Sequence, residues 1–175
     1  MGTIYSSCEI SIPFFVVWWS VYNLYELREE EGGEIFFTYP INVAKKELSK
    51  NLLFTCAYVV QSSVFLSVVT YLLLHNVNII IIINISSQIL FFSALSFTIM
   101  ILIRDSGWSA MIAFVYVCVG LFTYGEMLGK TNIFLYDYNS VDTNLIVNNI
   151  VKCLFFSFVS YIVGYILLDK KINIR

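Results

Sequence analysis

The side chains that most often carry chemistry in proteins are few and scattered in this sequence. His75 is the only histidine, and the four cysteines, Cys8, Cys56, Cys118 and Cys153, stand singly. Zinc and redox sites need several such residues at short spacing, and covalent catalysis needs an activated nucleophile. No GxxxxGKS or GxxxxGKT phosphate-binding motif occurs. We therefore expect no catalytic residue, no metal site and no cofactor bound by this chain, and an interfacial, solvated His75.

Hydrophobic residues make up 59% of the 175-residue chain, against about 45–50% in an ordinary soluble domain. They gather in five runs, and crossing a bilayer as a helix takes about 20 apolar residues. Solid runs favour helices over the alternating strands of a membrane barrel. The sequence predicts an all-α membrane protein, a polytopic helical bundle forming a single transmembrane domain over 1–175. Its expected transmembrane helices, about five, are 10–25, 52–74, 79–103, 107–125 and 147–168.

Lysine and arginine predict the orientation of these helices. Cytoplasmic loops of membrane proteins carry the excess of basic residues. Five crossings place eight of the ten on one side and leave Lys130 on the other, with Lys152 able to extend outward from the last run. We therefore expect a cytoplasmic loop over 26–51, an outward loop over 126–146, an outward N-terminus and a cytoplasmic C-terminus. The eight are Arg28, Lys45, Lys46, Lys50, Arg104, Lys170, Lys171 and Arg175.

Polar residues inside the runs have two interpretations. Asn84, Ser87 and Gln88 could line a translocation path, or they could hydrogen-bond neighbouring helices, as most polar side chains in membrane helices do; we expect the second. Glu9 and Glu26 bound the first run, so no carboxylate lies in mid-run, which argues against transport coupled to buried acids. The outward loop has no decisive period, and either a short interfacial or re-entrant element or a plain connection fits it.

The stretch ELREEEGGEIFFTYPINVAKKELSK, residues 26–50, is the only long charged segment. Gly32-Gly33 breaks the first helix, an apolar knob follows over 35–39, and Pro40 suits the start of a new amphipathic helix. One interpretation is a charged loop that anchors the ends of two spans. The other is a docking element, because aromatic anchors inside a polar rim are typical of protein interfaces.

The order of residues in this stretch resembles the cytoplasmic loop of the type 2 ATP-binding-cassette permease family. Those loops have an acidic segment with glycine, a glutamate before an apolar knob, a proline restart and a lysine before the next span. The resemblance implies a separate cytoplasmic ATPase that binds ATP and Mg, and a second permease subunit, identical or not. It also implies the docking residues, with Phe36 and Phe37 as anchors: Glu29, Gly32, Gly33, Glu34, Ile35, Phe36, Phe37, Tyr39, Pro40 and Lys45.

The layout departs from that family at the N-terminus, because its members have six spans and both termini inside. A natural short variant, an upstream start codon or a helix supplied by another subunit would each account for an absent first span. The resemblance implies an exporter subunit in a plasma membrane, with a peptide, lipid or antibiotic as cargo. A small non-transporting membrane protein, such as a bacteriocin immunity or sensor partner, is the alternative. A net charge of −2 without a basic patch excludes nucleic acid, and abundant Ile, Asn, Phe and Tyr indicate a low-GC bacterium.

Overall fold

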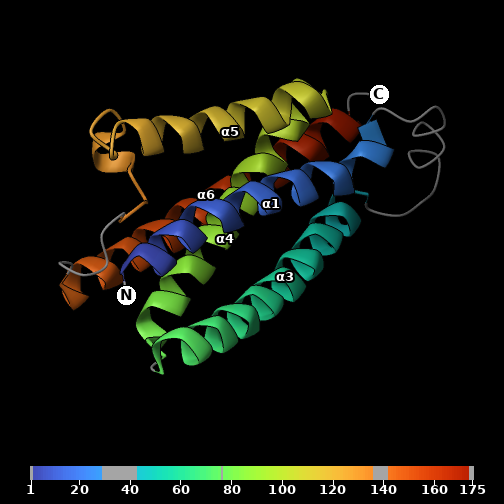
Figure 1. The fold of residues 1–175 in the computed structure, drawn as a ribbon. Helices are drawn as coiled ribbons and strands as arrows, with labels where there is room; N and C mark the ends of the chain where they lie inside the picture. Colours follow the sequence, from blue (N-terminus) through green and yellow to red (C-terminus); the bar gives the residue numbers. More distant parts are fainter. Residues whose placement is uncertain (1, 29–42, 76, 136–141, 174–175) are drawn as a thin grey trace.

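The computed structural model describes residues 2–28, 43–75, 77–135 and 142–173. These residues form α-helices and one short 3-10 turn, with no strand among them, which confirms the predicted all-α class (Figure 1). The elements are α1 (Gly2–Arg28), α3 (Val43–Leu74), α4 (Ile79–Ile103), α5 (Ser106–Phe122), η1 (Gly129–Thr131) and α6 (Thr143–Asn173).

Three of these helices are long and apolar enough to cross a membrane. The qualifying stretches are Ala44–Leu73 of α3, Ile79–Ile103 of α4 and Thr143–Lys170 of α6. α5 is apolar but has only 17 residues, and α1 has 27 residues but a more polar composition, with several serines and tyrosines. The long apolar helices fit the prediction of a membrane protein.

The helix bounds agree best with the prediction where a local signal stops the helix. α4 has the predicted bounds: Asn78 Oδ1 accepts a hydrogen bond from the Ile80 amide at 3.2 Å, and Arg104 ends the helix at a positive φ of 64°. Asp105 then caps α5 by accepting from the Trp108 amide at 2.8 Å. Asp and Asn are preferred caps because their side chains satisfy free amides at helix starts.

Two helices begin well before the predicted spans that they contain. α1 begins at Gly2 instead of residue 10, so Glu9 lies inside the helix. α3 begins at Val43 instead of residue 52, because the predicted amphipathic segment continues into the span as one helix. Ala44, Glu47 and Asn51 are buried in its first turns, and no glycine or proline follows Pro40 until Gly107 to interrupt the helical hydrogen bonds.

The central element of the bundle is α4. It packs most extensively against α6 and also contacts α1, α3 and α5. Ile85, Ile89, Phe92 and Phe97 along its length are fully buried. Gly164 lets α6 approach closely, since a Cβ atom there would lie 2.8 Å from the Phe97 ring. The other helices surround α4 and bury its side chains.

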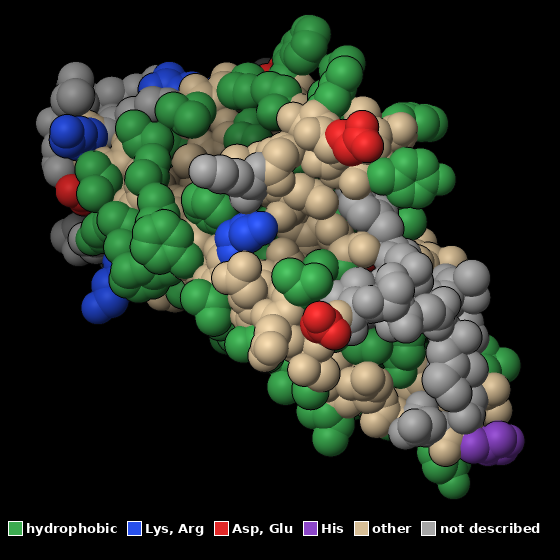
Figure 2. All heavy atoms as spheres, turned by 90° about the vertical axis from the view of Figure 1, so that its left-hand side faces the viewer, with side chains coloured by type: hydrophobic (Ala, Val, Ile, Leu, Met, Phe, Trp, Pro, Cys, Tyr) green, Lys and Arg blue, Asp and Glu red, His purple; other side chains and the backbone are tan. Residues whose placement is uncertain are grey.

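The ends of the helices gather at the two ends of the bundle. Figure 1 shows the Arg28 end of α1, the start of α3, the α4–α5 turn and the last turns of α6 at one end. We call this the basic end, because it brings Lys45, Lys46, Lys50, Arg104 and Lys170 together. The N-terminus, η1 and the start of α6 lie at the opposite end. Figure 2 faces that opposite end, and hydrophobic side chains cover much of the described surface there.

Candidate functional site

The predicted docking residues fall almost entirely outside the described residues. Only Lys45 is described; it is exposed in the first turns of α3, at the basic end. The other nine stay predictions: Glu29, Gly32, Gly33, Glu34, Ile35, Phe36, Phe37, Tyr39 and Pro40. His75 is exposed at the end of α3, where an interfacial histidine was expected.

The candidate path-lining residues Asn84, Ser87 and Gln88 are buried in the bundle. The Gln88 amide nitrogen donates to Glu9 Oε1 of α1 at 2.6 Å. Asn84 Oδ1 accepts from the Asn149 amide of α6 at 3.0 Å. Ser87 donates to the Asn84 carbonyl one turn back in α4, at 2.7 Å. The two amides therefore join α4 to neighbouring helices, which agrees with the interpretation of these residues as links between helices.

A short irregular segment, Asn132–Leu135, lies inside the bundle beside this cluster. Ile133 is fully buried and Phe134 nearly so. Both Gln88 and Asn149 donate to the Ile133 carbonyl at 2.7 Å. We call Asn132–Leu135 the entering segment, because its backbone enters the bundle instead of lying over its surface.

Side chains from three helices satisfy the backbone of the entering segment. Glu9 Oε1 accepts from the Leu135 amide at 3.0 Å, and Lys152 Nζ donates to the Asn132 carbonyl at 3.0 Å. Tyr116 supports the preceding residue by donating its hydroxyl to the Thr131 carbonyl at 2.6 Å. Non-helical backbone at membrane depth is tolerated only where protein groups or water satisfy it. These contacts satisfy much of the backbone of the entering segment and make the segment part of the bundle.

Glu9 is the residue of this cluster that the sequence interpretation placed wrongly. It was expected as an outer boundary of the first run, but it is 0% exposed within α1. A signal for this was present in the spacing, since Tyr5, Glu9, Ile12 and Val16 are three or four residues apart and all buried. A polar residue within the apolar stripe of a helix faces the same interior as the stripe.

A second buried polar cluster joins four helices around Ser93 of α4. Ser20 of α1 and Tyr161 of α6 each donate a hydroxyl to Ser93 Oγ at 2.9 Å. Thr55 Oγ1 of α3 lies 2.6 Å from the same atom and donates its own hydrogen to the Asn51 carbonyl. Ser93 must then donate its hydroxyl hydrogen to Thr55 Oγ1. With the two bonds that it accepts, the Ser93 hydroxyl uses its one hydrogen and both lone pairs. The Asn51 amide adds a longer contact at 3.2 Å.

Three polar atoms in or near these clusters are buried and form no hydrogen bond within the described part of the chain. They are Gln88 Oε1, Asn51 Oδ1 and Asn23 Nδ2. No group of three His, Cys, Asp or Glu residues able to hold a metal occurs among the described residues. Among the described residues, the two clusters connect neighbouring helices through hydrogen bonds.

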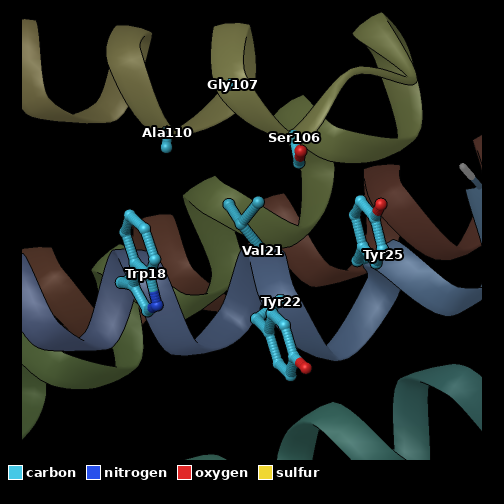
Figure 3. A pocket seen from close by; sticks show the side chains of 7 residues that line it. All are labelled: Trp18, Val21, Tyr22, Tyr25, Ser106, Gly107 and Ala110. Atoms are coloured by element: carbon cyan, nitrogen blue, oxygen red, sulfur yellow. The ribbon is translucent and has the colours of Figure 1, made fainter.

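An apolar cavity of about 220 Å³ lies between α1 and the first turns of α5. Figure 3 shows Val21 and Tyr25 directed toward α5, and Tyr22 directed away from it, toward α3. The small side chains of Ser106 and Ala110 leave the space open on the α5 side. A site of this composition suits an apolar group, such as a lipid chain, and offers few polar partners for orientation.

No family model, curated protein or solved structure matches this chain. The function is therefore inferred from the residues and their arrangement.

Proposed function

We propose that this chain is the membrane-spanning permease subunit of a bacterial ATP-binding-cassette exporter. The observation that carries the proposal is the position of the charged connection between α1 and α3. Arg28 and Val43, the described residues that flank it, both lie at the basic end of the bundle. A connection at the end rich in lysine and arginine faces the cytoplasm, where a soluble ATPase can bind the predicted anchors Phe36 and Phe37.

The proposed topology has five crossings, with the N-terminus outside and the C-terminus in the cytoplasm. The helices alternate in direction between the two ends of the bundle (Figure 1). α5, with 17 residues, extends about 26 Å and α1 about 40 Å, against a hydrocarbon core of about 30 Å. α1 crosses with Glu9 and Ser20 hydrogen-bonded to Gln88 and Ser93 of α4, and α5 crosses with its ends near both interfaces.

The Ser93 cluster offers a route by which docking would act on the bundle. It links α1 and α3, the two helices that flank the docking connection, to α4 and α6. Closure of two ATPases would displace the connection, and rigid, hydrogen-bonded helices would carry that displacement to the central helix. ATP and Mg would be bound by the partner, so this chain would be a transport subunit and not itself an enzyme. A peptide, lipid or antibiotic remains the proposed cargo.

The test is a pull-down of the tagged chain from its native membrane in mild detergent, with mass spectrometry of the proteins recovered. We expect a stoichiometric soluble ATPase. Replacing Phe36 and Phe37 together by alanine should remove the ATPase and abolish ATP-dependent export, because interface anchors carry most of the binding free energy. The matched control removes two exposed aromatic rings of α6, Phe155 and Phe158, and should leave the ATPase bound.

The alternative is a small membrane protein that does not transport, such as a bacteriocin immunity or sensor partner. The observation in its favour is that Asn84 and Gln88 hydrogen-bond α1, α6 and the entering segment instead of facing an open path. A chain recovered without an ATPase, together with an unchanged Phe36/Phe37 variant, would establish this alternative and contradict the exporter proposal.

A further inference from the structure

A groove of about 420 Å³ runs between α1 and α3 on the outside of the bundle. Figure 1 shows the two helices close together at the basic end and diverging toward the other end. Small and polar side chains contribute to its walls together with aromatic rings. Among the lining residues are Ser7, Ser11 and Phe15 of α1 and Tyr58, Gln61 and Phe65 of α3.

Gln61 distinguishes this groove from an ordinary lipid-facing surface. It lies within one turn of the middle of the apolar stretch Ala44–Leu73, and it is exposed. Its amide forms no hydrogen bond with any residue that the structure describes. Val60, Val64 and Val68 around it are exposed and apolar.

An amide at the centre of a membrane helix has no water to pair with, so its exposure to lipid is unfavourable. Polar side chains at this depth almost always face protein and hydrogen-bond another helix. The position of Gln61 therefore indicates that a helix, and not lipid alone, covers the groove.

We propose that a second copy of this chain occupies the groove, with α3 of each copy lying against α1 and α3 of the other. A primary amide carries both donors and acceptors, so two Gln61 side chains are complementary to each other. Two copies inserted in the same direction hold Gln61 at the same depth. A two-fold axis along the membrane normal then pairs each amide with its own counterpart, as in other isologous interfaces.

The residues around Gln61 fit close packing of two such helices. Gln61, Phe65, Val68 and Leu72 follow one another at three- or four-residue spacing on α3, and the last three are exposed. This spacing aligns side chains along one face of a helix, and a single polar residue in an apolar seam sets the register of pairing. Ser7 and Ser11 on α1 are small, which allows a second helix to approach the groove.

This interface rests on the proposed function in one respect, that two permease subunits pair in the bilayer. It adds that the second subunit is a copy of this chain and that it binds at the groove between α1 and α3. It requires no ATPase. Pairing of the purified chain and recovery of an ATPase from the native membrane can therefore be measured separately, and each can fail without the other.

The experiment uses the full chain in vesicles of phosphatidylcholine and phosphatidylglycerol, at a series of protein-to-lipid ratios. Energy transfer between labelled copies reports the monomer–dimer equilibrium. Gln61→Leu should weaken dimerisation by roughly tenfold, the size expected for losing interhelical hydrogen bonds in a membrane. Gln61→Asn should retain most of it. Val60→Leu, at a neighbouring exposed position on another face of α3, is the matched control and should change little.

Cross-linking tests the geometry independently of any loss of stability. In a background with the four cysteines replaced by alanine, Gln61→Cys should form a disulfide between copies on mild oxidation. Val159→Cys, exposed on α6, should not. The inference is overturned if the chain is monomeric at every density, which would leave the groove to lipid or to a different membrane protein. It is equally overturned if Gln61→Leu pairs as well as the unaltered chain, or if Val159→Cys cross-links in place of Gln61→Cys.

Discussion

At the scale of single residues, hydrogen bonds between buried side chains join the described helices. Ser93 Oγ is the clearest case, because one hydroxyl serves Ser20, Thr55 and Tyr161 from three other helices. In a bilayer the apolar effect does not by itself drive helices together, since lipid is as apolar as leucine. Packing and such polar contacts then decide which helices are neighbours.

Ser93→Ala should destabilise the bundle by about 2 kcal/mol. The substitution leaves the Ser20 and Tyr161 hydroxyls without their acceptor, and each orphaned buried donor costs about 1–3 kcal/mol, with membrane values toward the lower end. Thermal unfolding in detergent measures the loss. Ser67→Ala is the control, because Ser67 donates only to the Ser63 carbonyl of its own helix. Equal melting temperatures for both variants would contradict a joining role for Ser93.

At the scale of elements, the entering segment Asn132–Leu135 is the part of the fold that depends most on side chains from elsewhere. Helices satisfy their own backbone, but this segment relies on Gln88, Asn149, Lys152 and Glu9. Glu9 contributes twice, since one carboxylate oxygen accepts from both Gln88 and the Leu135 amide. Loss of that acceptor frees two buried donors at once.

Glu9→Leu should release the entering segment, whereas Glu9→Gln should hold it, because the glutamine carbonyl can still accept from the Leu135 amide. Hydrogen exchange in nanodiscs is the measurement. An orphaned buried donor costs about 1–3 kcal/mol, so the Leu135 amide should exchange at least about fivefold faster in Glu9→Leu. Unchanged exchange in both variants would mean that Gln88, Asn149 and Lys152 hold the segment without Glu9.

At the scale of the whole molecule, the sequence predicted the all-α class and the presence of long apolar helices, but not the polar contacts of the interior. Length and hydropathy were sufficient to find the helices that could cross a membrane, and the capping residues Asn78 and Asp105 mark where α4 and α5 begin. Glu9 was read as a boundary because an acid usually ends an apolar run. Its burial depends on two hydrogen-bond donors, the Gln88 side-chain amide and the Leu135 backbone amide. These lie 79 and 126 residues away in the chain. Local patterns contain no information about such distant partners.

The whole arrangement leads to a prediction about orientation in the membrane. Lys45, Lys46, Lys50, Arg104 and Lys170 share one end of the bundle, and basic residues of this kind stay in the cytoplasm. In a cysteine-free background, Asp142→Cys, exposed at the opposite end, should react with a membrane-impermeant maleimide on intact cells. Ser49→Cys, exposed near the start of α3, should react only after the membrane is opened.

The reverse pattern would place the connection between α1 and α3 outside the cell, beyond the reach of any ATP-hydrolysing partner, and would exclude the exporter proposal together with its docking residues. If both positions reacted from the same side, the starts of α3 and α6 would lie on the same side of the membrane. The proposed topology, in which successive helices cross in opposite directions, would then be wrong.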